Sequence, residues 1–175
     1  MIFSKGGSCF KKSLPAVGIL ALCVLFAFGL TRNPHQLPST LLHKSMADFT
    51  LPLLGSDKVL DSQTLKGKML VLNVFSSWCE TCLVENHFLM QLAKQGVFMV
   101  GLPYQDNPRN ALQWLHRYGS PYSVVVEDKQ SQLSINLGVY GVPETYLIDK
   151  DGRILYRHVG PLDEQVWKTK FLPYY

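Results

Sequence analysis

The sequence predicts an α/β sandwich built around a mostly parallel β-sheet. Short apolar, β-branched segments alternate with segments of helical periodicity, which is typical of strands joined by helical crossovers. Near the C-terminus a turn sequence, Lys150-Asp151-Gly152, predicts a hairpin that adds an antiparallel strand. With 175 residues, 47% of them hydrophobic and 17% charged, the chain is long enough for one such domain with its own core.

The expected elements follow in the order β-α-β-α-β-α-β-β-α. Met69–Phe75 is a near-continuous apolar run, which suits a central strand covered on both faces. Cys79–Gln95 has apolar residues at close to helical spacing, and a glycine follows it. A second buried strand is expected at Val97–Leu102. Pro108–Tyr118 is expected to be a helix, because proline suits a first helical turn and a glycine follows the last.

Shorter elements complete the pattern. A third strand is expected at Tyr122–Val126 and a short helix at Ser131–Leu137. The strands Thr145–Ile148 and Arg153–His158 flank the hairpin turn, and a final short helix is expected at Leu162–Phe171.

An apolar segment precedes the expected domain. Leu14–Leu30 contains no charged residue, Asn, Gln or His, and the first twelve residues carry three lysines and no acid. As a helix it would span roughly 26 Å, slightly less than a hydrocarbon core of about 30 Å. We expect an uncleaved signal anchor with the lysines in the cytoplasm; a cleaved signal peptide is the alternative, with Ala27-Phe28-Gly29 as a fair cleavage site.

The chain is therefore expected to have four parts. These are a basic cytoplasmic tail at 1–13, a single transmembrane helix at 14–31, a linker at 32–45 and a folded domain at 46–175. From Arg32 onward 14 basic and 13 acidic residues nearly cancel, so the net charge of +4 comes mostly from the tail. Nothing in this balance indicates a nucleic-acid partner.

Cys79 and Cys82 are the candidate catalytic residues. The two other cysteines, Cys9 and Cys23, lie in the tail and the apolar segment. A pair three positions apart closes too small a loop to be a useful structural staple. In an oxidising compartment such a pair indicates thiol–disulfide exchange.

The setting of this pair suits that chemistry. Cys79 is expected at the N-terminus of a helix, where unpaired backbone N–H groups and the helix dipole stabilise a thiolate. An exposed Cys79 can attack a substrate disulfide, and a buried Cys82 can then resolve the mixed disulfide. Trp78 is expected to cover one side of the pair.

Glu80 lies between the cysteines, and Glu85 lies one turn beyond Cys82. Negative charge near the pair disfavours the thiolate, which lowers the reduction potential and predicts a reductant rather than a strong oxidant. Alternatively, both carboxylates are simply solvated at the start of the helix.

Half of a zinc site is the other interpretation of the cysteine pair. Structural zinc needs four ligands, but no second pair exists and the five histidines never pair at ligand spacing. We therefore expect no metal and no cofactor besides the redox-active disulfide.

A family resemblance enters at these residues. Trp78-Cys79-Glu80-Thr81-Cys82 and Gly141-Val142-Pro143 resemble the active site of thioredoxin-fold proteins. Leu137–Asp149 (LGVYGVPETYLID) closely resembles the periplasmic thiol:disulfide interchange proteins of cytochrome c maturation (CcmG/DsbE type). So do Gly101–Tyr104 and Asn110–Tyr122, and the match covers about residues 41–170.

This resemblance implies a thioredoxin-like three-layer sandwich with a mixed central sheet, behind a single N-terminal transmembrane helix. It implies that Pro143 is cis and faces the disulfide, and that the backbone of Val142 pairs with a substrate chain like an added strand. It also implies supporting roles for Trp78, Glu80, Thr81, Glu85, Val142, Pro143 and Glu144. Tyr140 and Tyr146 are expected to be packing residues.

The implied function is that of a reductant anchored in the bacterial inner membrane by one pass, with its catalytic domain in the periplasm. It would take electrons from a membrane thiol–disulfide donor. It would pass them to the Cys-x-x-Cys-His disulfide of apocytochrome c, or to a thiol carrier protein that holds this site. The protein itself would bind no haem.

Two residues depart from the family pattern. Glu80 stands where proline is usual, and Asn73 stands where most thioredoxins carry a buried Asp that deprotonates the second cysteine. Because an amide cannot act as a base, another group must accept the proton of Cys82. Glu144, acting through a water, is the candidate.

Three other functions remain open. The first is a general periplasmic disulfide reductase or oxidase. The second is a copper metallochaperone with His158 as a distal ligand, although such proteins space their cysteines one residue further apart. The third is a peroxidase of the peroxiredoxin class, for which Ser76-x-x-Cys79 is a poor match.

Overall fold

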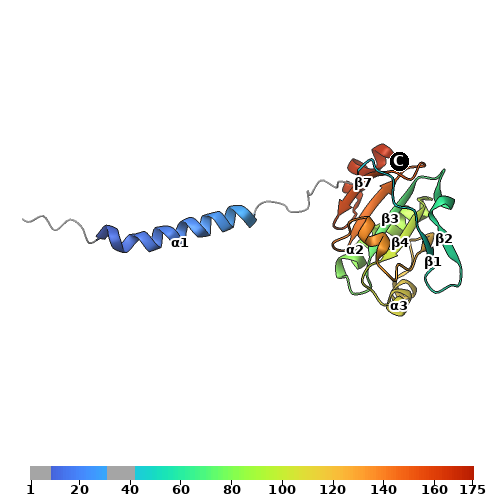
Figure 1. Cartoon of the computed structure of the whole chain (residues 1–175), viewed down its shortest axis with the longest axis horizontal. Helices are drawn as coiled ribbons and strands as arrows, with labels where there is room; N and C mark the ends of the chain where they lie inside the picture. The colour runs from blue at the N-terminus through green and yellow to red at the C-terminus, as the bar shows by residue number, and fades with distance from the viewer. Residues whose placement is uncertain (1–8, 31–41) are drawn as a thin grey trace, which may run out of the picture. The chain divides into compact units, whose positions relative to one another are not determined.

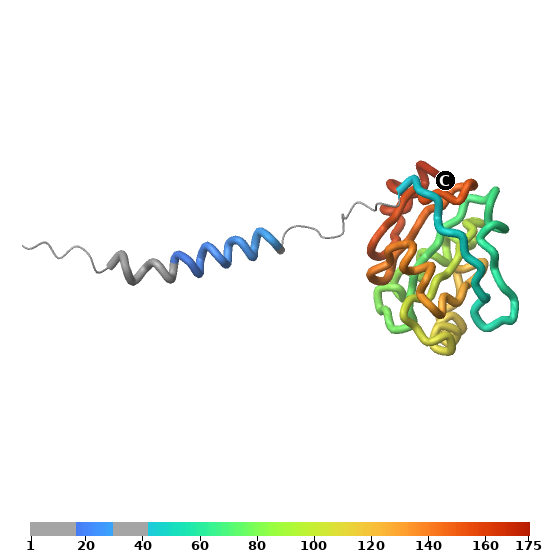
Figure 2. Tube along the Cα trace, viewed as in Figure 1, coloured from blue at the N-terminus to red at the C-terminus, as the bar shows by residue number. Residues whose placement is uncertain are grey.

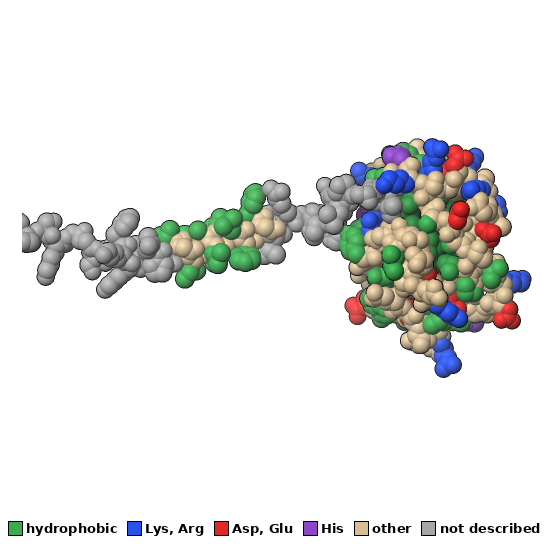
Figure 3. All heavy atoms as spheres, viewed as in Figure 1, with side chains coloured by type: hydrophobic (Ala, Val, Ile, Leu, Met, Phe, Trp, Pro, Cys, Tyr) green, Lys and Arg blue, Asp and Glu red, His purple; other side chains and the backbone are tan. Residues whose placement is uncertain are grey.

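The computed structural model describes residues 9–30 and 42–175 (Figure 1). The chain divides into two units, Met1–Pro38 and Ser39–Tyr175. The first contains α1 (Cys9–Leu30), which overlaps the segment 14–31 predicted to span a membrane but begins within the predicted tail. Its described side chains are mostly hydrophobic (Figure 3). Across the ranges that the structure covers, no helix is both long enough and apolar enough to cross a membrane. The predicted tail and linker lie mostly outside the described residues.

The second unit is an α/β sandwich, as predicted. A two-stranded sheet comes first, and a five-stranded sheet with flanking helices follows. The elements are β1 (Thr50–Pro52), β2 (Val59–Asp61), η1 (Ser62–Leu65), β3 (Leu70–Phe75), α2 (Glu80–Lys94), β4 (Met99–Pro103), α3 (Pro108–Tyr118), β5 (Val124–Val125), α4 (Gln132–Asn136), β6 (Glu144–Ile148), β7 (Ile154–Val159), α5 (Glu164–Val166), the π-helical turn η2 (Trp167–Phe171) and η3 (Leu172–Tyr174).

The five-stranded sheet is mixed and has the order β5-β4-β3-β6-β7. β3, β4 and β5 are parallel, whereas β6 is antiparallel to both of its neighbours. The strand that runs opposite to the other four is therefore β6, the first strand of the β6–β7 hairpin. The reason is the length of α4: five residues span about 7.5 Å, too little to carry the chain back along the sheet.

β3 lies at the centre of the sheet, and all six of its residues are buried. Leu70, Leu72 and Val74 pack on one face, against the N-terminal hairpin and α4. Val71 and Phe75 pack on the other face, where α2, α3 and the C-terminal helical segment lie. This alternation follows from the two-residue period of a strand and gives the domain its three layers.

The N-terminal hairpin of β1 and β2, traced in turquoise in Figure 2, was not predicted. Each strand has only three residues, too few to show a reliable period. The chain before it is also attached to the domain, because the N–H of His43 donates to Ile154 O and Ser45 forms a bridge with Arg153. Leu42 also packs against the core, so contacts with the domain begin four residues before its predicted start.

Candidate active site

Cys79 and Cys82 form a disulfide at the N-terminus of α2, with their Cα atoms 5.3 Å apart. Cys79 caps the helix, since its sulfur accepts a hydrogen bond from the N–H of Cys82 at 3.0 Å. Cys79 is 8% exposed and Cys82 is 3% exposed. Cys79 is therefore the more accessible cysteine, as predicted. In this disulfide form, however, its side chain is almost completely buried, whereas an exposed Cys79 was expected.

The loop between β3 and α2 is fixed by the loop after β4. The N–H and hydroxyl of Ser77 donate to the two carboxylate oxygens of Asp106, at 2.5 and 2.7 Å. The indole N–H of Trp78 donates to Gln105 O at 3.1 Å, and its ring remains 59% exposed. Asp106 thus holds the segment that precedes Cys79, a role that sequence reasoning missed because its partner lies 29 positions away.

An aromatic layer packs beneath the disulfide. Phe75 lies between Trp114 and Tyr122, with ring centroids 5.4 and 5.0 Å away. Gly101 makes room for the ring of Tyr122, because a Cβ atom there would lie 2.7 Å from Tyr122 Cδ2. This close approach directs the Tyr122 hydroxyl toward the centre of β3.

Asn73 joins three elements in one buried network. Its amide nitrogen donates to Glu85 Oε1 at 2.9 Å and to Thr145 Oγ1 at 3.0 Å. Its amide oxygen accepts from the Tyr122 hydroxyl at 2.7 Å. Burial raises the pKa of Tyr122 well above its ordinary value, and the nearby Glu85 adds to this, so the hydroxyl stays a donor. Asn73 cannot accept a proton, but it orients the carboxyl of Glu85.

Glu85 lies one helical turn after Cys82 and is 2% exposed. Burial raises the pKa of Glu85 to about 8, although hydrogen bonds from the Leu162 backbone, Thr145 and Asn73 oppose the rise. Glu85 is therefore not the solvated carboxylate of the alternative interpretation. It is a buried acid whose raised pKa, about 8, lies close to the ordinary pKa of a thiol at about 8.5.

The Val142–Pro143 peptide bond is cis, as expected. Val142 packs against the cluster that contains both cysteines and Phe75. Pro143 is buried, and its carbonyl oxygen accepts from the N–H of Gly160 at 2.9 Å. Among the described residues, no backbone partner is found for the N–H or C=O of Val142.

Glu144, the predicted proton acceptor, is fully buried and has other partners. Its Oε1 accepts from Arg157 Nη2 at 2.5 Å, and its Oε2 accepts from the Tyr146 hydroxyl at 2.7 Å. Burial raises the pKa of Glu144, and the bonds to Tyr146 and Arg157 oppose the rise. Its side chain packs with Tyr146, on the face opposite Thr145 and Glu85. Glu144, the expected proton acceptor, therefore already has two partners, whereas Glu85 shares a sheet face with Cys82.

The remaining predicted residues, Glu80 and Thr81, are exposed in the first turn of α2. His158, named as a possible copper ligand, has its Nε2 atom 3.2 Å from Pro161 O. In the part of the chain with described coordinates, no group of three or more His, Cys, Asp or Glu side chains is arranged to hold a metal ion.

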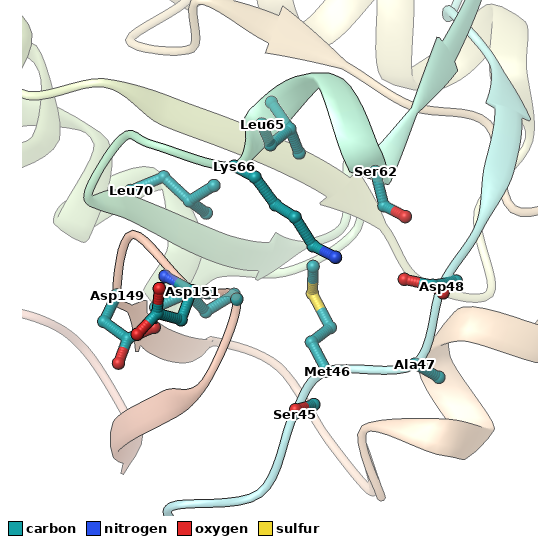
Figure 4. A pocket seen from close by; sticks show the side chains of 12 residues that line it. Ser45, Met46, Ala47, Asp48, Ser62, Leu65, Lys66, Leu70, Asp149 and Asp151 are labelled. Atoms are coloured by element: carbon teal, nitrogen blue, oxygen red, sulfur yellow. The ribbon is translucent and has the colours of Figure 1, made fainter.

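The pocket shown in Figure 4 lies away from the disulfide. It has a volume of about 410 Å³, and its lining includes Leu70, Ile148, Asp149, Asp151 and Lys66. Leu70 begins β3 and Ile148 ends β6, whereas the cysteines follow the end of β3 and the cis-proline precedes β6. This pocket is therefore at the opposite end of the sheet from the redox pair.

Comparison with known proteins agrees with this geometry. The Redoxin family profile matches residues 42–170. A thiol:disulfide interchange protein DsbE from Vibrio cholerae is 42% identical over 168 residues, covering 93% of this chain and 91% of that protein. DsbE from Yersinia pestis is 43% identical over 180 residues, covering 98% and 96%.

Solved structures share the fold. A protein from Chlorobium tepidum assigned as thiol:disulfide interchange protein DsbE superposes with a TM-score of 0.65, at 25% identity over 74% of this chain and 94% of that one. With its disulfide at a helix N-terminus and its cis-proline, the chain belongs to the DsbE-type thiol:disulfide interchange proteins of the Redoxin family, and it is a thiol–disulfide oxidoreductase.

Proposed function

We propose that this protein reduces the Cys-x-x-Cys-His disulfide of apocytochrome c, or of a thiol carrier protein that holds this site, during cytochrome c maturation. The observation that carries the reductant chemistry is the Cys79–Cys82 disulfide at the N-terminus of α2, with the buried carboxyl of Glu85 one turn beyond Cys82. The resemblance of Leu137–Asp149 to the proteins of cytochrome c maturation supports the substrate. A reductant must deprotonate its buried second cysteine in every turnover, and an acid–base group with a pKa near the working pH suits this task.

The proposed reaction has two exchange steps. The thiolate of Cys79 attacks one sulfur of the substrate disulfide, so that a mixed disulfide forms and a substrate thiolate leaves. Cys82 then transfers its proton to the Glu85 carboxylate and attacks the sulfur of Cys79. The Cys79–Cys82 disulfide forms, the second substrate sulfur leaves, and the proton passes from Glu85 to a substrate thiolate.

The surroundings of the pair support reduction rather than oxidation. Oxidants of this fold gain from groups that stabilise the thiolate of the first cysteine. Here Cys79 is largely buried, Glu80 follows it, and the carboxylate of Asp106 binds the backbone two residues before it. Both burial and neighbouring negative charge disfavour a thiolate, which stabilises the disulfide form and lowers the reduction potential.

In this proposal Trp78, Thr81 and Val142 form the surface that receives the substrate, and the buried Pro143 holds Val142. The backbone of Val142, which has no partner among the described residues, pairs with the substrate strand. Electrons come from a membrane thiol–disulfide donor.

The protein acts in the bacterial periplasm, and residues 14–31 anchor it in the inner membrane by a single pass. The anchor rests on the apolar run and the lysines before it.

The test uses the reduced full-length protein and an oxidised peptide that contains Cys-x-x-Cys-His. The control is a peptide with the histidine replaced by alanine and the cysteines moved further apart. We expect faster reduction of the first peptide, no reaction with Cys79→Ser, and a trapped mixed disulfide with Cys82→Ser. Equal rates for the two peptides would contradict the cytochrome c assignment and favour a general disulfide reductase.

A further inference from the structure

Arg157 on β7 contacts the segment that precedes the cis-proline. Its Nη2 atom donates to the carbonyl oxygen of Gly138 at 2.9 Å and to Glu144 Oε1 at 2.5 Å. One guanidinium therefore joins the two ends of the segment Gly138–Glu144. This segment contains Val142, whose backbone is free among the described residues.

The same guanidinium lies between two tyrosine rings. Its Cζ atom is 5.2 Å from the ring centroid of Tyr140 and 5.6 Å from that of Tyr146. Tyr146 is fully buried, whereas Tyr140 is 53% exposed, three residues before the proline. Tyr146 is thus the packing residue that was expected, but Tyr140 is an exposed ring held in place by a cation–π contact.

Arg157 is well suited to hold this segment. Its side chain is only 10% exposed, and its buried ion pair with Glu144 fixes its position. A planar guanidinium can bind a carbonyl and a carboxylate while it stacks on aromatic rings, which a lysine ammonium cannot do. None of the hydrogen bonds that hold the Cys79–Cys82 turn involves Arg157.

We propose that Arg157 is a positioning residue: it holds Gly138–Pro143 in the conformation in which Val142 pairs with a substrate backbone, and so sets the preference for polypeptide disulfides over small disulfides. The inference rests on the proposed pairing of the substrate with Val142. A small disulfide needs only the sulfur of Cys79, so its reduction does not depend on this segment.

The experiment compares two rates for each variant of the reduced full-length protein. One is kcat/KM for an oxidised peptide containing Cys-x-x-Cys-His, and the other is the rate with a small aromatic disulfide, dithionitrobenzoate. The key pair is Glu144→Gln and the double variant Glu144→Gln with Arg157→Met. The double variant leaves no unpaired charge in the core, so it is expected to fold even if Arg157→Met alone does not. Glu144→Gln removes the countercharge of Arg157 but keeps its bond to Gly138 O, and its fold is checked by urea unfolding before the rates are compared. Arg153→Met, an exposed arginine on the same hairpin, is the matched control.

We expect the peptide rate to fall about tenfold from Glu144→Gln to the double variant, through a higher KM, while the small-disulfide rate and the reduction potential stay unchanged. The peptide rate of Arg157→Lys should lie between those of Glu144→Gln and the double variant. The peptide rate of Arg153→Met should match that of the wild type. If both rates fall equally, or neither falls, Arg157 does not position the segment. If the wild type does not reduce the peptide at all, the proposed function fails together with this inference.

Discussion

Two buried carboxyl groups lie on opposite faces of the central sheet, and their surroundings differ. Glu85 on α2 contacts neutral groups, the amide of Asn73 and the hydroxyl of Thr145. Glu144 at the start of β6 contacts a cation, Arg157, and the hydroxyl of Tyr146. Both are at most 2% exposed to solvent, and their hydrogen-bond partners differ in charge.

In the proposed mechanism this difference in partners makes Glu85 the reactive acid and Glu144 the structural one. A buried carboxyl with neutral partners is stabilised in its protonated form, and its pKa moves toward neutral pH. Burial also raises the pKa of Glu144, but its bonds to Tyr146 and to the Arg157 cation oppose the rise and hold these neighbours in place. In the proposed mechanism the proton transfer takes place on the face of Cys82, and the ion pair on the other face supports the cis-proline segment.

Removing the cation is expected to have the largest effect. Arg157→Met leaves Glu144 buried without a countercharge, and we expect the free energy of unfolding to fall by about 3 kcal/mol at pH 7. Urea unfolding followed by tryptophan fluorescence measures this. Addition of Glu144→Gln should recover most of the loss. A loss below about 1 kcal/mol would mean that the ion pair does not hold Glu144 as described.

Removing the acid on the other face should affect the reaction more than the stability. Glu85→Gln keeps the shape of the side chain but cannot accept the proton of Cys82, so we expect the second exchange step to slow by about 100-fold. Rapid-quench analysis should show that the mixed disulfide accumulates. A normal rate of resolution would exclude Glu85 as the proton acceptor.

The pH dependence of stability tests the same residue without a substrate. The pKa of Glu85 rises from 4.5 to about 8 on folding, so the folded state binds more protons between these values. The free energy of unfolding should therefore fall as the pH rises from 5 to 8, by at least about 1 kcal/mol. Urea unfolding of Glu85→Gln, measured in parallel, should lack this part of the decline. Parallel curves for the two proteins would place the pKa of Glu85 near its ordinary value.

A smaller effect on the reaction is expected at Thr145, whose hydroxyl is hydrogen-bonded to both Glu85 and Asn73. Thr145→Val removes a donor to the carboxylate and should raise the pKa of Glu85 further, with a loss of about 1 kcal/mol of stability. The pH profile of the second exchange step should move to higher pH. Thr169→Val, at an exposed threonine, is the matched control, and a shift of equal size there would refute the assignment.

The smallest effect is expected at Glu80, which is exposed beside Cys79. Solvent screens its charge, so Glu80→Gln should change the peptide reduction rate by less than about twofold. A larger change in the same stopped-flow assay would show that the exposed acid, and not burial, dominates the thiolate chemistry.

The elements that depend on local sequence patterns could be predicted from the sequence. The apolar run of β3, the helix after Cys79 and the bounds of α3 follow from periodicity, proline and glycine, and the structure agrees. Cys79 and Cys82 follow from their spacing alone. The mixed sheet followed from the hairpin turn together with the family resemblance.

The roles of the two acids could not be predicted in this way. Glu85 closely follows Cys82 in sequence and Glu144 directly follows Pro143, but the side chains that distinguish the two acids come from other strands. Asn73 lies 12 positions before Glu85, and Arg157 lies 13 positions after Glu144. Only the register of β3, β6 and β7 shows which partner each acid meets, so the ion pair of Glu144 with Arg157 and the neutral partners of Glu85 could not be predicted from the sequence.

The reduction potential of the Cys79–Cys82 pair tests the central claim most directly. Equilibration of the full-length protein with a series of thiol buffers at pH 7, followed by alkylation of free thiols, gives this value. We predict a potential at or below about −200 mV, as required of a disulfide reductant with a disfavoured thiolate. A value near the strongly oxidising end, about −120 mV, would contradict the account and identify the protein as a disulfide donor.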